Sequence, residues 1–407
     1  MSLNSAPQGV RVHIGLFGKR NAGKSSVINA ITNQQAAIVS DVAGTTTDPV
    51  FRPMEILPIG PCVLIDTAGL DDVGELGNLR INKSLDVLSK TDIALLVIDA
   101  SIGLCNEDLS LIDTLSSKNI PYVLVLNKID KVNNLGELIK DIKSNVKCPV
   151  VPVSSTEKTG FDNLKKEIIN TLPENSGDFK LLTNLVKPND YVVLVVPIDK
   201  AAPKGRLILP QQQVIREILD IGAISIVVKE DNLKNTLENL PIKPKLVITD
   251  SQAFEQVSKD TPEDIALTSF SILFARQKGD LAELIKGAYA IDNLKDGDKI
   301  LMAEGCTHHR QIDDIGTVKI PNMIRQRAKK ELTFEFTSGV SFTEDISKYA
   351  LVVHCGACMM NRSAMLSRIE KAKEYNVPIV NYGVLIAYAK GILDRSIKPV
   401  MELTYED

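Results

Sequence analysis

Short apolar runs rich in β-branched residues alternate with amphipathic stretches between residue 10 and about residue 172. A short, continuous apolar run predicts a buried strand, and apolar side chains repeating every three to four positions predict a helix packed against it. Regular alternation of the two indicates βαβ units and a mostly parallel, doubly wound sheet. The strands are expected at 10–17, 62–66, 93–99, 122–126 and 150–153, and the helices at 25–32, 107–118 and 161–172.

Two further α/β patterns follow the turn-forming stretch 173–178, which we interpret as a linker. The first of these patterns predicts a small sheet. Small sheets commonly extend or cover themselves by association, so this part is a candidate dimerisation domain. Its strands are expected at 191–196, 224–228, 246–249 and 265–268, and its helices at 211–220, 232–240 and 253–258. The second pattern predicts strands at 299–304, 332–337, 351–354 and 378–382, with helices at 281–290 and 362–373.

The predicted fold class is therefore α/β, with three domains in a chain of 407 residues, because domains commonly have roughly 100–200 residues each. The expected bounds are 8–172 for the doubly wound domain, 180–268 for the small dimerisation domain and 271–407 for the last domain.

The composition and the apolar runs argue against two classes of function, nucleic-acid binding and insertion into a membrane. A net charge of −4 lacks the electrostatic footprint of a general nucleic-acid binder, and 4% aromatic residues with no Trp leave few base-stacking platforms. The longest apolar runs, such as 93–98 and 191–197, fall far short of the roughly 20 residues that cross a bilayer. The N-terminus has no basic segment followed by an apolar run. We predict a cytoplasmic protein that binds neither nucleic acid nor membrane.

A phosphate-binding motif, GKRNAGKS at residues 18–25, lies between a predicted strand and a predicted helix. Glycines there let backbone N–H groups close around phosphate oxygens at a helix N-terminus. Lys24 would reach the β- and γ-phosphates, and the Ser25 hydroxyl would bind Mg²⁺. The nucleotide contacts expected here come from Gly18, Asn21, Ala22, Gly23, Lys24, Ser25 and Ser26.

Three further motifs follow predicted strands. Asp66-Thr67-Ala68-Gly69 offers a carboxylate for a Mg²⁺-bound water and a Gly69 amide for the γ-phosphate. Asn127-Lys128-Ile129-Asp130 resembles the guanine-reading motif of GTPases, in which the Asp selects GTP over ATP. Ser154 and Ser155 match the loop that supports the guanine O6 in that family.

The segment Gly44-Thr45-Thr46-Thr47-Asp48 resembles the switch of the GTPases typified by the tRNA-modification enzyme TrmE. By that resemblance Thr46 adds a Mg²⁺ ligand, and Asn21 helps to coordinate K⁺. Leu70 stands where Ras-like GTPases place a water-positioning Gln, so intrinsic hydrolysis should be slow and potassium is the expected activator.

Thiolate and imidazole groups follow two strands expected in the last domain. Cys306-Thr307-His308 comes after one strand, and His354-Cys355-Gly356-Ala357-Cys358 after another. Three Cys with one or two His suit either a closed, structural Cys₃His zinc site or a [4Fe–4S] cluster with one exchangeable iron corner. The 45 residues between His308 and His354 are many for a compact zinc knuckle, which favours iron.

Taken together, these motifs resemble the HydF family of [FeFe]-hydrogenase maturation GTPases. Two further stretches also match it, 197–210 and 268–276, together with Asn361-Arg362. The resemblance implies a scaffold that receives a transient [2Fe] precursor made with the radical-SAM maturases HydE and HydG and delivers it to apo-[FeFe]-hydrogenase, HydA. It also implies GTP, Mg²⁺, K⁺ and a [4Fe–4S] cluster as cofactors, and a homodimer or higher oligomer. Cys306, Cys355 and Cys358 match the family's cluster ligands, with the fourth position open to His308, His354 or an exchangeable ligand.

A rival interpretation comes from another functional class. An RNA-modification or ribosome-assembly GTPase could carry a structural zinc site at the same cysteines. The acidic charge and the low aromatic content favour the scaffold over this alternative.

Overall fold

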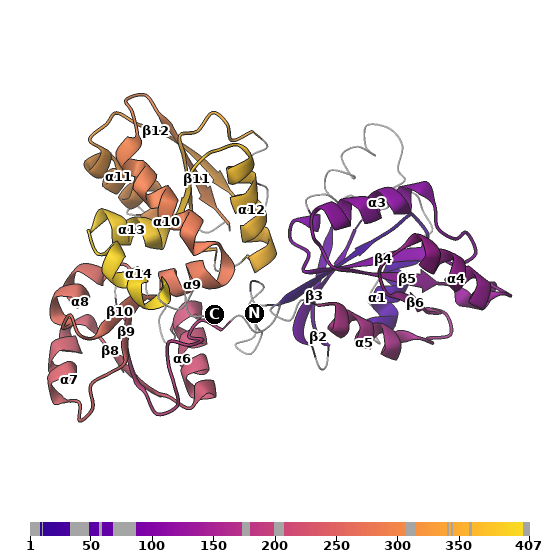
Figure 1. Cartoon of the computed structure of the whole chain (residues 1–407), viewed down its shortest axis with the longest axis horizontal. Coiled ribbons are helices and arrows are strands. Elements are labelled where there is room, and N and C mark those ends of the chain that lie inside the picture. The colour runs from indigo at the N-terminus through magenta and orange to yellow at the C-terminus, as the bar shows by residue number, and fades with distance from the viewer. Residues whose placement is uncertain are drawn as a thin grey trace. The chain divides into compact units, whose positions relative to one another are not determined.

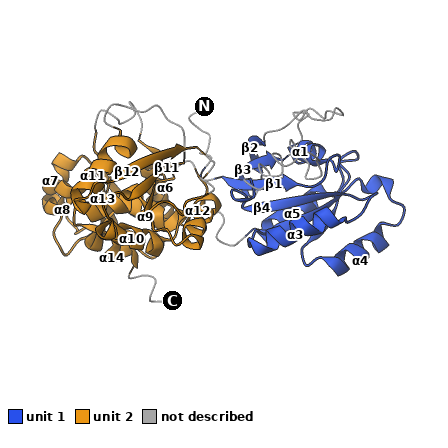
Figure 2. Cartoon of the chain, turned by 90° about the horizontal axis from the view of Figure 1, so that it is seen from above, with its two compact units in different colours: residues 1–178 blue, residues 179–407 orange. Residues whose placement is uncertain are grey.

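The chain forms two compact units, residues 1–178 and 179–407 (Figure 2). The computed structural model describes residues 9, 11–32, 49–56, 59–67, 87–172, 180–198, 207–305, 314–339, 342, 345–357 and 360–401. The expected linker at 173–178 lies outside these residues, and the expected domain bounds stay predictions.

The first unit is built on a six-stranded sheet in the order β2-β3-β1-β4-β5-β6, parallel except for the edge strand β2 (Figure 1). Apolar side chains of α1 and α5 pack on one face and those of α3 and α4 on the other, so the predicted doubly wound sheet is confirmed. The elements are β1 (Val12–Phe17), α1 (Lys24–Thr32), β2 (Val50–Ile56), β3 (Gly60–Asp66), β4 (Ile93–Asp99), α3 (Asn106–Ser117), β5 (Tyr122–Asn127), α4 (Leu135–Asn145), β6 (Val150–Pro152) and α5 (Phe161–Thr171).

The second unit contains two four-stranded sheets, each parallel throughout, in the orders β10-β9-β7-β8 and β12-β11-β13-β14. The elements of the first sheet and its helices are β7 (Tyr191–Val195), α6 (Leu209–Ile221), β8 (Ile224–Val228), α7 (Leu233–Asn239), β9 (Leu246–Thr249), α8 (Phe254–Asp260), β10 (Ala266–Ser269) and α9 (Phe270–Lys278). The remainder are α10 (Leu281–Tyr289), β11 (Lys299–Glu304), α11 (Ile320–Ala328), β12 (Thr333–Ser338), β13 (Leu351–His354), α12 (Arg362–Glu374), β14 (Ile379–Asn381), α13 (Tyr382–Ala389) and α14 (Leu393–Met401).

One continuous apolar core joins the two sheets of the second unit. It includes Leu194 and Ile248 from the first sheet and Met302 and Val353 from the second. Helix α9 contributes much of the material between them, because it contacts α6 on one side and α12 and α13 on the other (Figure 1). The two predicted domains therefore share a core rather than touching at a surface.

The predicted α/β class is confirmed, with the mostly parallel sheet expected in the first unit. The two sheets of the second unit, whose strand direction is not predicted from the sequence, are also parallel, and the differences concern individual elements. Strand β2 and helices α4, α9, α11, α13 and α14 are not predicted from the sequence. Helices α9 and α13 are buried over most of their length, so they lack the polar face that produces a helical period. Strand β2 carries Pro53, which is tolerated because the strand lies at the sheet edge.

Helix α10 packs so closely on β14 that a side chain cannot be added at Gly287. A Cβ there would lie 1.9 Å from the Ile379 carbonyl oxygen, which is backbone and cannot turn away. Gly287→Ala should therefore destabilise the second unit by about 1–3 kcal/mol, as overpacking does, despite the better helix propensity of Ala. Urea denaturation followed by circular dichroism measures the effect.

Gly136 in α4 is the matched control, because no atom lies within 4 Å of a Cβ placed there. Gly136→Ala should be neutral or stabilising by up to about 1 kcal/mol. An unchanged urea midpoint in Gly287→Ala would contradict the close approach of α10 and β14.

Candidate functional site

Four of the predicted nucleotide-binding motifs, as far as the structure describes them, lie at the carboxyl ends of parallel strands in the first unit, whereas the predicted switch at 44–48 lies outside the described residues. Strand β1 leads into the loop at 18–25, β3 ends at Asp66, β5 ends at Asn127 and β6 precedes Ser154. The register places Leu16 beside Asp66 and Asp99 beside Asn127. Carboxyl ends of neighbouring parallel strands form the usual ligand crevice of such sheets, so the topology brings the motifs together.

The glycine positions of the phosphate-binding loop are required by its conformation. Gly18 has φ +140°, and a Cβ there would lie 2.2 Å from the Val97 carbonyl oxygen. Gly23 has φ +95°, and a Cβ there would lie 2.3 Å from Asn127 Nδ2. The loop is thus pressed against β4 and β5, with the N-terminus of α1 immediately behind it.

Lys24 is buried in this loop, at 8% exposure. Its Nζ donates to the Gly18 and Lys19 carbonyl oxygens, each at 2.9 Å. These bonds hold the ammonium inside the curve of the loop, where phosphate oxygens would bind.

Ser25 and Asp66 form the predicted magnesium pair. The Ser25 hydroxyl donates to Asp66 Oδ2 at 2.7 Å, although the two residues are far apart in the sequence. A hydroxyl and a carboxylate at this distance are suitable oxygen ligands for Mg²⁺, one directly and one through water. Ser26 lies in the first turn of α1, next to this pair.

The guanine-reading residues form a connected network. Asn127 is 1% exposed, and its amide donates to the Ala22 carbonyl oxygen at 3.0 Å. Asn127 Oδ1 accepts from the Ser155 N–H at 3.2 Å and the Ser155 hydroxyl at 2.9 Å. The Ser154 hydroxyl donates to Asp130 Oδ1 at 2.6 Å, which orients the carboxylate expected to read guanine. The network joins the phosphate loop to both guanine loops.

Asp99 is a member of this site that the sequence analysis does not identify. Lys128 Nζ donates to Asp99 Oδ2 at 2.6 Å and to the Asn21 carbonyl oxygen at 2.6 Å, which fixes Lys128 across the phosphate loop. Burial alone would raise the pKa of Asp99, but hydrogen bonds from Lys128 and Ser101 outweigh it and lower that pKa below its ordinary value. Its position as the last residue of β4, paired with Asn127 of β5, was the available signal.

Five predicted site residues lie outside the described residues. These are Thr46, Gly69, Cys306, His308 and Cys358. Within the described part of the chain, no group of three or more His, Cys, Asp or Glu residues could hold a metal ion. The predicted cluster site can therefore be followed only through Cys355, His354 and the strands beside them.

Cys355 directly follows β13, next to the strand that leads toward the other predicted cysteine motif. Strands β11 and β13 are parallel neighbours, with Ala303 opposite His354. The Cys355 N–H donates to the Ala303 carbonyl oxygen at 2.9 Å, and the Gly305 N–H donates to Cys355 Sγ at 3.1 Å. Gly305 is the last described residue before Cys306 in the sequence.

His354 is fully buried, and both its ring nitrogens take part in hydrogen bonds. Nδ1 lies 2.7 Å from the Cys355 carbonyl oxygen, and Nε2 lies 2.6 Å from Nη1 of the buried Arg368. Burial, reinforced by the Arg368 charge, lowers the pKa of His354 to about 3. The neutral ring donates from Nδ1 and accepts at Nε2, so iron ligation by His354 would require one of these contacts to break.

The surroundings of Cys355 fit an anionic, thiolate-bound group. A backbone N–H already donates to the sulfur, and two buried cations, Lys278 and Arg368, lie around the loop that carries it. Donors and cations of this kind stabilise iron–sulfur clusters and tune their potentials. The sequence analysis misses both cations, because a buried Lys or Arg within a helix gives no motif of its own.

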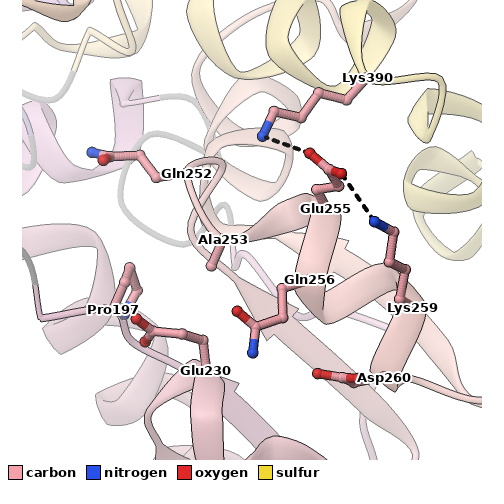
Figure 3. Close-up of a pocket in the computed structure, with 9 residues that line it drawn as sticks. All are labelled: Pro197, Glu230, Gln252, Ala253, Glu255, Gln256, Lys259, Asp260 and Lys390. Atoms are coloured by element: carbon pink, nitrogen blue, oxygen red, sulfur yellow. Dashed lines mark hydrogen bonds and ion pairs between the residues drawn. The ribbon is translucent and has the colours of Figure 1, made fainter.

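A pocket of about 500 Å³ lies elsewhere in the second unit, beyond the carboxyl ends of β7 and β9 (Figure 3). Glu255 lies between two lysines there, with its carboxylate 3.0 Å from Lys259 Nζ and 4.0 Å from Lys390 Nζ. The pair with Lys390 joins α8 to the segment after α13, whereas the pair with Lys259 lies within α8, and exposed ion pairs of this kind contribute little stability.

Family models match three separate parts of the chain. The Hydrogen maturase F dimerization domain matches residues 181–279, and the Hydrogen maturase F tetramerization domain matches residues 282–399. The chain belongs to the HydF family. A model described as 50S ribosome-binding GTPase matches residues 13–128, so this HydF-family member is also a P-loop GTPase.

Curated relatives match the GTPase part of this HydF-family chain. The tRNA modification GTPase MnmE of Thermoanaerobacter sp. (strain X514) is 41% identical over 157 residues, which are 38% of this chain and 33% of that protein. The GTPase Der of Wolinella succinogenes is 36% identical over 176 residues, 41% of this chain and 37% of that protein. The chain thus spans about a third of the length of these relatives.

Proposed function

We propose that this HydF-family GTPase is an iron–sulfur scaffold that receives a diiron precursor and delivers it to apo-[FeFe]-hydrogenase. The observation that carries the proposal is the hydrogen bond to Cys355 Sγ from the N–H of Gly305, which directly precedes Cys306 in the sequence, at the point where β11 and β13 lie side by side. A nucleotide site and a thiolate site in one chain, on separate compact units, suit a carrier whose loading is controlled by GTP.

In the nucleotide site, the chain's own groups position GTP for attack of water on the γ-phosphorus, with GDP as the leaving group. Lys24 would stabilise charge on the phosphates, Ser25 and Thr46 would bind Mg²⁺, and Asp66 would hold the ion through water. Asp130 selects guanine and Asn127 holds the loops together. Asn21 has φ 60° and is exposed, which suits coordination of the K⁺ that we propose as activator.

In the second unit, Cys306, Cys355 and Cys358 would hold a [4Fe–4S] cluster, with the fourth ligand from His308, His354 or an exchangeable group. When bound, the cluster supplies an iron corner at which the diiron cargo can attach and leave. The chain's own contribution is to direct three thiolates to one point and to surround them with donors and buried cations.

The proposed partners are HydE and HydG, which make the cargo, and HydA, which receives it. The matched domains are named for dimerization and tetramerization, which supports a homodimer or a tetramer. Among the residues that the structure describes, no helix combines the length and apolarity needed to cross a bilayer. We place the protein in the cytoplasm, where thiols stay reduced.

Anaerobic purification of the full chain tests the proposal. We expect a brown protein with broad absorption near 400 nm and about four irons per chain, as a [4Fe–4S] cluster requires. The reduced protein should show an EPR signal and should activate apo-hydrogenase when loaded with cargo. A colourless protein with one zinc per chain would instead support the RNA-modification or ribosome-assembly alternative.

A further inference from the structure

Lys278, the last residue of α9, reaches the loop that carries the cysteines. Its side chain is buried, at 4% exposure, and its Nζ donates to the carbonyl oxygens of Ala357 at 3.0 Å and Met360 at 2.9 Å. Ala357 lies between Cys355 and Cys358 and has φ 52°, a left-handed conformation uncommon for a residue with a side chain. The ammonium therefore holds the backbone on both sides of Cys358.

A second contact joins the same two segments, with the donor side chain now on α12 and the acceptor carbonyls at the end of α9. The Arg362 guanidinium, in the first turn of α12, donates to the Gln277 and Gly279 carbonyl oxygens at the end of α9. Side chains from each segment thus bind the backbone of the other. The end of α9 and the backbone at Ala357, Met360 and Arg362 form a reciprocal clamp, and a lysine as buried as Lys278 is almost always paired.

We propose that Lys278 is a positioning residue of the cluster site, which fixes the backbone at Ala357 and Met360 next to the predicted ligands and raises the reduction potential of the bound cluster. The inference rests on the proposed scaffold function. Reduction adds negative charge to a cluster that three thiolates already make anionic, so a fixed cation nearby stabilises the reduced state. Arg368, which bonds to His354, is a second cation of this kind.

The clamp also connects two parts of the chain that carry different family names. Lys278 falls within the match to the dimerization domain, and Ala357 and Met360 fall within the match to the tetramerization domain. A displacement of α9, which contacts α6 of the first sheet, would therefore be transmitted to the cysteine loop. Lys278 gives the dimerization domain a direct contact with the cluster site.

The test uses the full chain, purified anaerobically, with three substitutions and a matched control. Lys278→Met keeps the length of the side chain without charge or donor, Lys278→Gln keeps a donor without charge, and Lys278→Arg keeps the charge. Lys286→Met on α10 is the control, since its ammonium is exposed and pairs with Glu283. The measurements are the midpoint potential from an EPR-monitored redox titration and the rate of iron loss to a chelator.

We expect Lys278→Met to shift the midpoint potential to a more negative value and to speed iron loss by about tenfold, as loss of an outer-shell contact does. Lys278→Gln should share the potential shift, whereas Lys278→Arg and Lys286→Met should stay near wild type. A wild-type midpoint potential and rate of iron loss in Lys278→Met would overturn the inference. If the Met variant does not fold, a wild-type midpoint potential in Lys278→Gln would overturn it. A wild-type protein without any cluster would overturn the scaffold function itself.

Discussion

Lys24→Ala is expected to lower GTP hydrolysis by about 10²- to 10³-fold, the cost of removing one electrostatic contact to the transition state. The buried ammonium, held by the Gly18 and Lys19 carbonyl oxygens, is the cation inside the phosphate loop. Because the nucleotide site and the cysteine site are in separate units, the variant should keep its full iron content. Phosphate release and iron analysis on the same preparation measure both.

Lys19→Ala is the matched control in the same loop. Lys19 pairs with Glu107 at 2.9 Å on the surface, and exposed pairs contribute little, so hydrolysis should change by no more than about twofold. We also expect Lys24→Ala to fail in activating hydrogenase, since GTP turnover is proposed to time the exchange of partners. Activation at the wild-type level by Lys24→Ala would contradict that timing role.

Cys355→Ala is expected to remove the cluster and with it the ability to activate hydrogenase. The variant loses the thiolate that accepts a hydrogen bond from the Gly305 N–H, and two remaining thiolates cannot hold four irons. Iron per chain should fall by at least about tenfold, while GTP hydrolysis in the other unit stays near wild type. Anaerobic iron and sulfide analysis, with a GTPase assay, measures the two effects.

Cys105→Ala makes the same chemical change at a free thiol in the first unit. Iron content and hydrogenase activation should remain at wild-type levels in this control. If Cys355→Ala kept both its iron and its activity, the cysteine site would have to be abandoned.

The candidate nucleotide site could be located from the sequence because its predicted residues stand in short consecutive motifs. The Gly18–Ser25 loop, Asp66 and Asn127–Asp130 each follow a strand, and the parallel topology brings them together. Asp99 could not be predicted in this way, because a single Asp at the end of a strand is common. Only its hydrogen bond with Lys128 in the folded chain shows its role.

The second unit shows the limit of sequence patterns more clearly. Hydrophobic periodicity predicts helices with one face in water, so α9 and α13, which are mostly buried, carry no period to detect. Lys278 and Arg368 are missed for a related reason, since a charged residue in a helix is usually an exposed one. Their partners are backbone carbonyls and a histidine ring far along the chain.

The shared core of the second unit bears on how such a protein could arise. The matches to the dimerization and tetramerization domains end and begin at Gly279 and Ala282, within a chain segment whose flanking helices belong to one apolar core. Recombination that separated the two matched domains would expose Phe270 and Phe274, which are buried in the shared core. The dimerization and tetramerization domains should therefore be inherited together. The GTPase unit has its own cores and could be gained or exchanged by gene fusion.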